Sequence, residues 1–159
     1  RNLWSDEQTA RQYIREGLNF CDVAKLSDEE CTFLCGDGEI DALGRRLLAE
    51  HPNLKLLFVT CGAGGIYAFC GSRMAFVPGF SVKIADTTGA GDAFVGAVLY
   101  QILRRGGLRE AYSPAELEQL LTFGNAVGAL SVQRYGAIPA IPTLAETESF
   151  LHAQGLLGA

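Results

Sequence analysis

The apolar residues of the chain recur with two different periods, and the pattern predicts helices alternating with short strands over the first half. Ser5 is followed by acids and then by Ala10, Ile14 and Leu18 at helical spacing, which predicts a capped helix. The same reasoning predicts a strand over 20–26, a short helix beginning at Ser27, a glycine break at 36–38 and a helix from 40 that ends before Pro52.

The segment 54–60 is short, strongly apolar and bounded by Asn53 and a glycine cluster, so we expect it to be a central strand. Further strands are predicted over 66–70, 74–77 and 82–84, the first two joined at Gly71-Ser72, and further helices over 93–105, from Ser113 to about 133 and over 143–154. Together these elements predict an α/β fold in which a mainly parallel sheet is flanked by helices.

Composition narrows the function classes. The chain has 159 residues, of which 48% are hydrophobic and 19% charged, a balance typical of one globular domain. Its net charge is −5 and its basic residues form no stripe, which argues against nucleic acid as a partner. Its apolar runs are far shorter than the roughly 18 residues that cross a bilayer, so we expect no membrane partner.

The cysteines and histidines exclude several kinds of chemistry. Five cysteines form no CxxC pair and their number is odd, which favours free thiols in a reducing cytoplasm. Two histidines, His51 and His152, are too few for a zinc site or a Ser-His-Asp arrangement, so catalysis must rest on carboxylates and main-chain groups. The chain begins with neither methionine nor a signal pattern, and we expect it to be a fragment of a longer protein.

The segment Asp-Thr-Thr-Gly-Ala-Gly-Asp, from Asp86 to Asp92, carries the strongest chemical signal, because it leads directly into an apolar helix. Gly89, Ala90 and Gly91 are small enough for a phosphate to approach main-chain N–H groups at the positive end of that helix. Asp92 would lie beside the phosphate and accept a proton, with magnesium offsetting the repulsion between the two anions. The alternative is a tight turn whose last aspartate stabilises the helix start.

This segment resembles, without a gap, the signature of the ribokinase/PfkB family of carbohydrate kinases. The resemblance implies a three-layer α/β/α fold and ATP-dependent phosphorylation of a sugar hydroxyl. It makes Asp92 the catalytic base and the amides of Gly89, Ala90 and Gly91 an anion hole. It also implies a site for a monovalent cation such as potassium, formed by Asp86, Thr88 and main-chain groups near Ser131, Arg134 and Gly136.

Two more segments match the nucleotide site of the family. Thr60, Gly62 and Gly65 belong to a glycine-rich turn after the most apolar strand, and the resemblance implies that this turn contacts ATP. A plain glycine-rich hairpin is the alternative, and neither a Rossmann nor a P-loop pattern fits. Asn125 matches the polar residue beside the adenine pocket, although tight helix packing also explains its small neighbours.

The acidic turn at 27–30 aligns with the Asn-x-x-Glu motif of the family, which implies that Glu30 holds magnesium through water. Ser27 stands where many members have asparagine, and a role as helix cap also explains it. The hexapeptide 25–30, Lys-Leu-Ser-Asp-Glu-Glu, is similar to the variant of fructokinases, and residues 2–4 resemble a segment of fructokinase-like members. These features favour fructose as the substrate.

The resemblance covers nearly the whole chain but corresponds to the carboxyl-terminal half of a family member. We therefore expect 1–159 to be the nucleotide-binding part of a single ribokinase-like domain, without the amino-terminal half that supplies the lid and most sugar contacts. The resulting hypothesis is a fructokinase that transfers the γ-phosphate of ATP to a hydroxymethyl oxygen. The alternatives are a 2-keto-3-deoxygluconate kinase, a ribokinase-like kinase and a catalytically silent nucleotide-binding homologue, and a homodimer is compatible with each.

Overall fold

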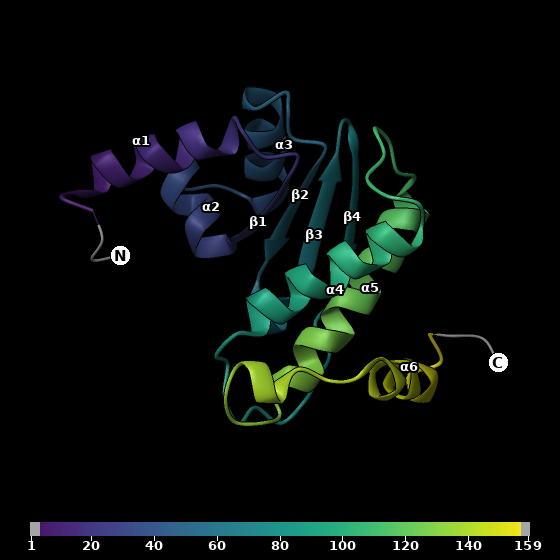
Figure 1. The fold of residues 1–159 in the computed structure, drawn as a ribbon. Helices are drawn as coiled ribbons and strands as arrows, with labels where there is room; N and C mark the ends of the chain where they lie inside the picture. The colour runs from purple at the N-terminus through teal and green to yellow at the C-terminus, as the bar shows by residue number, and fades with distance from the viewer. Residues whose placement is uncertain (1–3, 157–159) are drawn as a thin grey trace.

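The computed structural model describes residues 4–156, so part of the segment 2–4 lies outside the described residues. The elements in chain order are α1 (Glu7–Leu18), β1 (Val23–Ser27), α2 (Asp28–Cys35), α3 (Ile40–Glu50), β2 (Leu56–Thr60), a 3-10 turn (Gly62–Gly64), β3 (Ile66–Cys70), β4 (Arg73–Val77), α4 (Ala90–Arg104), α5 (Pro114–Ser131), a second 3-10 turn (Ile138–Ala140) and α6 (Leu144–Ala153). The sheet lies between α1–α3 on one face and α4 and α5 on the other, which confirms the three layers (Figure 1). Among the described helices, none has the length and hydropathy needed to cross a membrane.

The four described strands lie in the order β1-β2-β3-β4, with β1 parallel to β2 and the other two pairs antiparallel. The expected central strand is confirmed, because β2 pairs on both edges and is buried along most of its length. The sheet is mixed rather than mainly parallel, which corrects the sequence expectation. The connections explain the difference, because α2 and α3 provide the long crossover of a parallel pair, whereas short turns at 61–65 and 71–72 join antiparallel strands.

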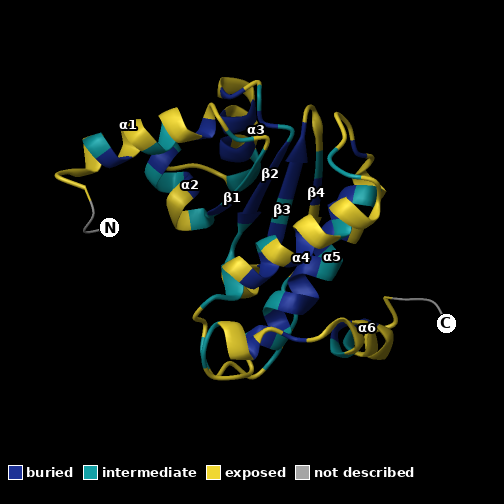
Figure 2. Cartoon of the chain, viewed as in Figure 1, coloured by how far each residue is buried: buried dark blue, intermediate teal, exposed yellow. Residues whose placement is uncertain are grey.

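Each face of the sheet has its own apolar core (Figure 2). Leu56 and Phe58 of β2 face α4 and α5, and the Phe58 ring meets Phe94 of α4 edge-on with 5.7 Å between centroids. Leu57 and Val59 face α1–α3. Because β2 is covered on both sides, its sequence is continuously apolar instead of alternating with polar residues.

The predicted helix starts at Ser27 and Ser113 are confirmed as capping boxes. Each serine hydroxyl accepts an N–H three residues on, and the glutamate at that position accepts the N–H of the serine. In α1 the cap is Asp6 rather than Ser5, since the Asp6 carboxylate accepts the Thr9 N–H at 2.7 Å. A carboxylate at this position satisfies the same main-chain donor that a serine would.

Three elements differ from the sequence expectation in the structure. The first strand begins at Val23 instead of Phe20, because the Asn53 amide donates to the carbonyls of Leu18 and Cys21 and holds the intervening residues in a turn. Residues 82–84 form a loop instead of a strand, and α4 begins three residues earlier than predicted. The loop that contains 82–84 has no strand partner and instead joins the end of α5, where the Ala85 N–H donates to Val132 at 2.7 Å.

Gly44 marks the closest approach between α3 and the sheet. A Cβ at position 44 would lie 2.3 Å from the Phe69 ring, whereas a Cβ at Gly96 in α4 would meet nothing within 4 Å. We predict that Gly44→Ala lowers the free energy of unfolding by about 1–3 kcal/mol through overpacking. Gly96→Ala, the matched control, should raise it by roughly 0.5–1 kcal/mol. Urea denaturation measures both, and a Gly44→Ala variant as stable as wild type would contradict the tight packing.

His51 is buried at the end of α3 with 4% of its surface exposed, and its Nε2 has no hydrogen-bond partner. Its Nδ1 lies 2.7 Å from Asn19 Oδ1. Burial lowers the pKa of His51 below its usual 6.5. Below about pH 6.5 the unfolded chain therefore binds more protons at this residue than the folded chain does.

We predict that the contribution of His51 to stability is fully present above about pH 6.5 and is lost as the pH falls toward the lower folded-state pKa. Denaturant titrations at a series of pH values from about 7.5 to about 5, which bracket the ordinary histidine pKa, measure how the free energy of unfolding changes with pH. His51→Gln should flatten this dependence, and His152→Gln, which changes an exposed histidine, should leave it unchanged. An unaltered slope in His51→Gln would contradict the assignment.

Candidate active site

A cavity of about 340 Å³ opens at the carboxyl end of β2, between the loop 79–84 and the first turn of α4, with α5 as its far wall. It brings together five of the predicted nucleotide and phosphate residues, namely Thr60, Gly62, Ala90, Gly91 and Asn125. The loop 79–84 was not predicted as part of the site, although Phe80, Val82 and Ile84 form much of the apolar wall. Their apolar character suggested a strand, and the sequence carried no separate signal for a cavity wall.

The glycine-rich turn after β2 forms one rim of the cavity. Thr60 is partly buried at the end of the strand, while Gly62 and Ala63 are exposed along the rim. Gly65 is not among the lining residues in the described part of the chain. Its φ is 116° and a Cβ there would lie 2.3 Å from the Val77 carbonyl oxygen, so glycine is required to close the turn into β3.

The start of α4 faces the cavity without a side-chain cap. Gly89 occupies the N-cap position with a left-handed φ of 76°, and a Cβ there would lie 2.8 Å from that of Ala137. The Ala90 N–H donates to the Thr87 carbonyl at 3.3 Å. Among described residues, the N–H groups of Gly91 and Asp92 have no acceptor, so they are the donors free to bind an anion.

Asp92 lies in the first turn of α4 with its side chain exposed. Within residues 4–156 its carboxylate has no hydrogen bond and no ion pair. A carboxylate beside two unsatisfied main-chain donors can accept a proton from a hydroxyl group that attacks a bound phosphate. The structure thus places the predicted base and the predicted anion hole on the same helix turn.

Asp86 ties the motif to the turn that follows α5. Its Oδ1 accepts the hydroxyl of Thr88 at 2.6 Å and the Thr88 N–H at 2.9 Å, and its Oδ2 accepts the Gly136 N–H at 2.9 Å. These bonds, led by the one from the Thr88 hydroxyl, lower the pKa of Asp86 to about 2. The carboxylate is therefore ionised at neutral pH and holds three of the predicted cation-site residues together.

The other two predicted cation-site residues have partners of their own. The Ser131 hydroxyl is buried and donates to the Gly128 carbonyl at 2.8 Å, within the same helix. The Arg134 guanidinium pairs with Glu146 of α6. That bond leads the contacts that lower the pKa of Glu146 to about 2. A guanidinium has no acceptor atom, so any contribution of Arg134 to a cation site would come from its main-chain carbonyl, as the resemblance implies.

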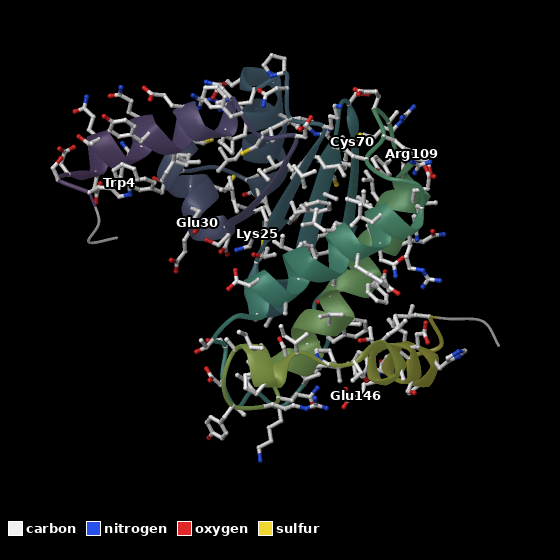
Figure 3. All side chains as sticks on the ribbon, in the orientation of Figure 1. Trp4, Lys25, Glu30, Cys70, Arg109 and Glu146 are labelled. Carbon is white, nitrogen blue, oxygen red and sulfur yellow. The ribbon has the colours of Figure 1, made fainter. Side chains whose placement is uncertain are left out.

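Glu30 projects from the first turn of α2, which begins directly after β1 (Figure 3). Its Oε2 accepts the Ser27 N–H at 2.7 Å, while the Ser27 hydroxyl accepts the Glu30 N–H at 3.1 Å. The helix-cap role expected for Ser27 is thus confirmed. Among described residues, Glu30 Oε1 has no protein partner, which leaves one carboxylate oxygen for a metal-bound water.

Asn125 is buried in α5 and lines the cavity. Its amide nitrogen donates to the Pro78 carbonyl at 2.8 Å and so holds the beginning of the loop 79–84 against the helix. Phe80 packs edge-on against Phe150 of α6, with 5.0 Å between ring centroids. The structure thus gives Asn125 a role in shaping the cavity wall beside any contact with a ligand.

Lys25 is a residue at the site that sequence reasoning did not single out. It lies on β1, and its side chain reaches the first turn of α4, where a Cβ on Gly91 would be 3.0 Å from Nζ. The signal available in the sequence was the two-residue period of the strand, which puts Lys25 on the same face as Val23. The sequence does not reveal which helix covers that face.

Comparison with known proteins gives consistent matches. The pfkB family carbohydrate kinase profile matches residues 2–144. Fructokinase-2 of Solanum lycopersicum is 42% identical over 149 residues, which are 94% of this chain and 44% of that protein. The structure of fructokinase with bound ATP from Xylella fastidiosa matches with a TM-score of 0.84 and 33% identity over 98% of this chain and 50% of that chain. A fructokinase double mutant from Vibrio cholerae O395, with fructose, ADP and potassium bound, matches with a TM-score of 0.79 and 33% identity over 94% of this chain and 46% of that one.

The chain spans about half the length of the curated relatives it matches. The family match includes the acidic turn of α2, the glycine-rich turn after β2 and the uncapped start of α4. The match covers about nine-tenths of the chain, so it includes both the motif and most of the fold. The chain belongs to the pfkB family of carbohydrate kinases.

Proposed function

We propose that the protein is an ATP-dependent sugar kinase, and within that class a fructokinase that phosphorylates a hydroxymethyl oxygen. The observation that carries the proposal is the start of α4, where two main-chain N–H groups adjoin the exposed carboxylate of Asp92 and none of these groups has a partner within residues 4–156. Family membership and the likeness to fructokinases support it.

The cavity suits a nucleotide that lies with its base toward α5 and its phosphates toward α4. Phe80, Val82 and Ile84 offer apolar surface to a flat base, as ligand cavities commonly do. Gly62 and Gly91 present main chain without side chains to the cavity, where phosphate oxygens can approach N–H groups closely. The terminal phosphate then lies at the first turn of α4.

Phosphoryl transfer at this turn depends on position and charge. The N–H groups of Gly91 and Asp92 stabilise the negative oxygens of the transferred group. The acceptor hydroxyl becomes acidic as its oxygen bonds to phosphorus, and the Asp92 carboxylate takes the proton. Excluding water from the turn keeps the phosphoryl group from hydrolysis.

The donor groups also fit the expected cations. Magnesium prefers hard oxygen ligands and commonly keeps waters and substrate phosphates around it, which matches the single available oxygen of Glu30. Within residues 4–156, no three His, Cys, Asp or Glu side chains lie close enough together to hold a metal ion by themselves. Binding through waters and substrate phosphates does not require such a group. When bound, magnesium supplies positive charge to the phosphates. Potassium is proposed beside ionised Asp86, near the main chain of Gly136.

Fructose is proposed as the acceptor because of the fructokinase-like hexapeptide 25–30 and the similarity to plant and bacterial fructokinases. No observation in the structure favours 2-keto-3-deoxygluconate or ribose. A silent homologue would have no need for an unpaired carboxylate at the helix start, which argues against that alternative.

Five free thiols support a reducing cytoplasm. A homodimer and the assignment of 1–159 to the nucleotide-binding part of one domain stay predictions.

We predict that Asp92→Asn in the full-length protein lowers turnover with fructose and magnesium-ATP by at least about 10²-fold, because the amide cannot accept the proton. ATP affinity should change little. Asp37→Asn, an exposed aspartate in the turn between α2 and α3, is the control and should keep wild-type turnover. A coupled assay over a panel of sugars measures both variants, and near-normal turnover in Asp92→Asn would remove Asp92 as the base.

Potassium dependence tests the role of Asp86. We expect turnover to fall when potassium is replaced by a bulky organic cation at equal ionic strength, because ionised Asp86 attracts the smaller cation. Asp86→Asn removes the charge and should abolish this response. Initial rates across a potassium titration measure it, and an equal response in wild type and variant would exclude Asp86 from the cation site.

A further inference from the structure

Lys25 stands at the point where β1 approaches α4. Val23 and Lys25 alternate with Ala24 and Leu26, which pack toward α1–α3, so Lys25 belongs to the α4 face of the sheet. Its register partner on β2 is Phe58, whose ring packs on α4. Figure 3 shows Lys25 on β1 and Glu30 on the first turn of α2, which follows that strand.

The ammonium of Lys25 lies against the main chain of Gly91. A Cβ on Gly91 would be 3.0 Å from Nζ, which is a tight contact, and 3.5 Å from Cε, which is an ordinary one. The absence of a side chain at position 91 therefore lets the ammonium lie close to the main chain. Among the described residues, the N–H of Gly91 also has no acceptor.

Lys25 has no ion-pair or hydrogen-bond partner among the residues that the structure describes. Lys55, by contrast, pairs with Asp22 at 3.5 Å and Glu110 at 2.6 Å. Lys25 is partly buried and sits at the positive end of α4, where the helix dipole disfavours a cation. This placement opposes the stability of the fold, which is the expected signature of a group that serves a ligand.

Among the described residues, Asp92 and Lys25 form no ion pair with each other. The carboxylate and the ammonium are thus both available at the same helix turn. The ammonium can serve phosphate oxygens with its three N–H donors while the carboxylate serves a hydroxyl group.

We propose that Lys25 is a catalytic residue whose ammonium binds the γ-phosphoryl group of ATP during its transfer; this inference rests on the proposed kinase function. The bond from the γ-phosphorus to the bridging oxygen breaks, and its electron pair leaves with ADP. The sugar oxygen bonds to the same phosphorus, and its hydroxyl proton passes to Asp92. Lys25 keeps its own protons and stabilises the negative charge on the transferred oxygens.

The test uses the full-length protein and the variants Lys25→Met and Lys25→Arg, with Lys55→Met as the control. Calorimetry measures the binding of adenosine, magnesium-ADP and the magnesium complex of β,γ-imido-ATP, and a coupled assay measures kcat with fructose. Lys25→Met should bind adenosine and ADP normally, bind imido-ATP about tenfold more weakly and lose on the order of 10²-fold in kcat. Lys25→Arg should recover part of the loss, and Lys55→Met should match wild type.

The outcomes separate this inference from the proposed function. Wild-type kcat in Lys25→Met, in a preparation whose wild type phosphorylates a sugar, overturns the role of Lys25 alone. Equal weakening of adenosine, ADP and imido-ATP would assign Lys25 to packing and overturn it too. A wild-type protein that neither binds magnesium-ATP nor phosphorylates any sugar overturns the kinase proposal, and the role of Lys25 with it.

Gly91→Ala tests the position of the Lys25 ammonium without removing the lysine. The substitution puts a methyl group 3.0 Å from the position of Nζ, so part of its effect on kcat comes from a shift of the Lys25 ammonium. That part is absent in the Lys25→Met background, and the fold-loss caused by Gly91→Ala should be smaller there than in wild type. Equal fold-losses in the two backgrounds would show that Nζ does not act beside Gly91.

Discussion

The uncapped start of α4 is the constraint on which the candidate site depends. Most helices of this protein begin with a side chain that satisfies a first-turn N–H, as Ser27 and Ser113 do. At α4 the N-cap is Gly89, which has no side chain to offer and packs against Ala137 in a left-handed conformation. The helix thus retains unsatisfied donors, and these suit an anion better than water because they are fixed in position before it arrives.

Tertiary contacts hold this helix start in place. The carboxylate of Asp86 joins the motif to Gly136, and the carbonyl of Val132 accepts the N–H groups of Ala85 and Asp86. Asn125 fastens the other end of the same loop to α5 through Pro78. The loop that lines the cavity is therefore fixed at both ends to α5, and this helix acts as the frame for the cavity wall.

Opposite charges meet at the site without pairing. Lys25 reaches the first turn of α4 from a strand, and Asp92 lies in that turn. Lys55, by contrast, pairs with Asp22 and Glu110, which lie far from it in the sequence. Two charged groups that tertiary structure brings to one helix turn, with no ion pair between them in residues 4–156, are available to a charged ligand.

The sequence by itself determined the features that depend only on residues close together in the chain. Helix caps at Ser27 and Ser113, the buried strand β2 and the small residues at the start of α4 follow from local hydrogen bonding, from hydrophobic periodicity and from side-chain size. Tertiary structure alone decided the mixed direction of the strands, the turn-closing role of Gly65, the loop 79–84 as a cavity wall and the approach of Lys25 to Gly91. These features depend on packing between residues far apart in the chain, and a local pattern carries no information about which distant surface it will meet.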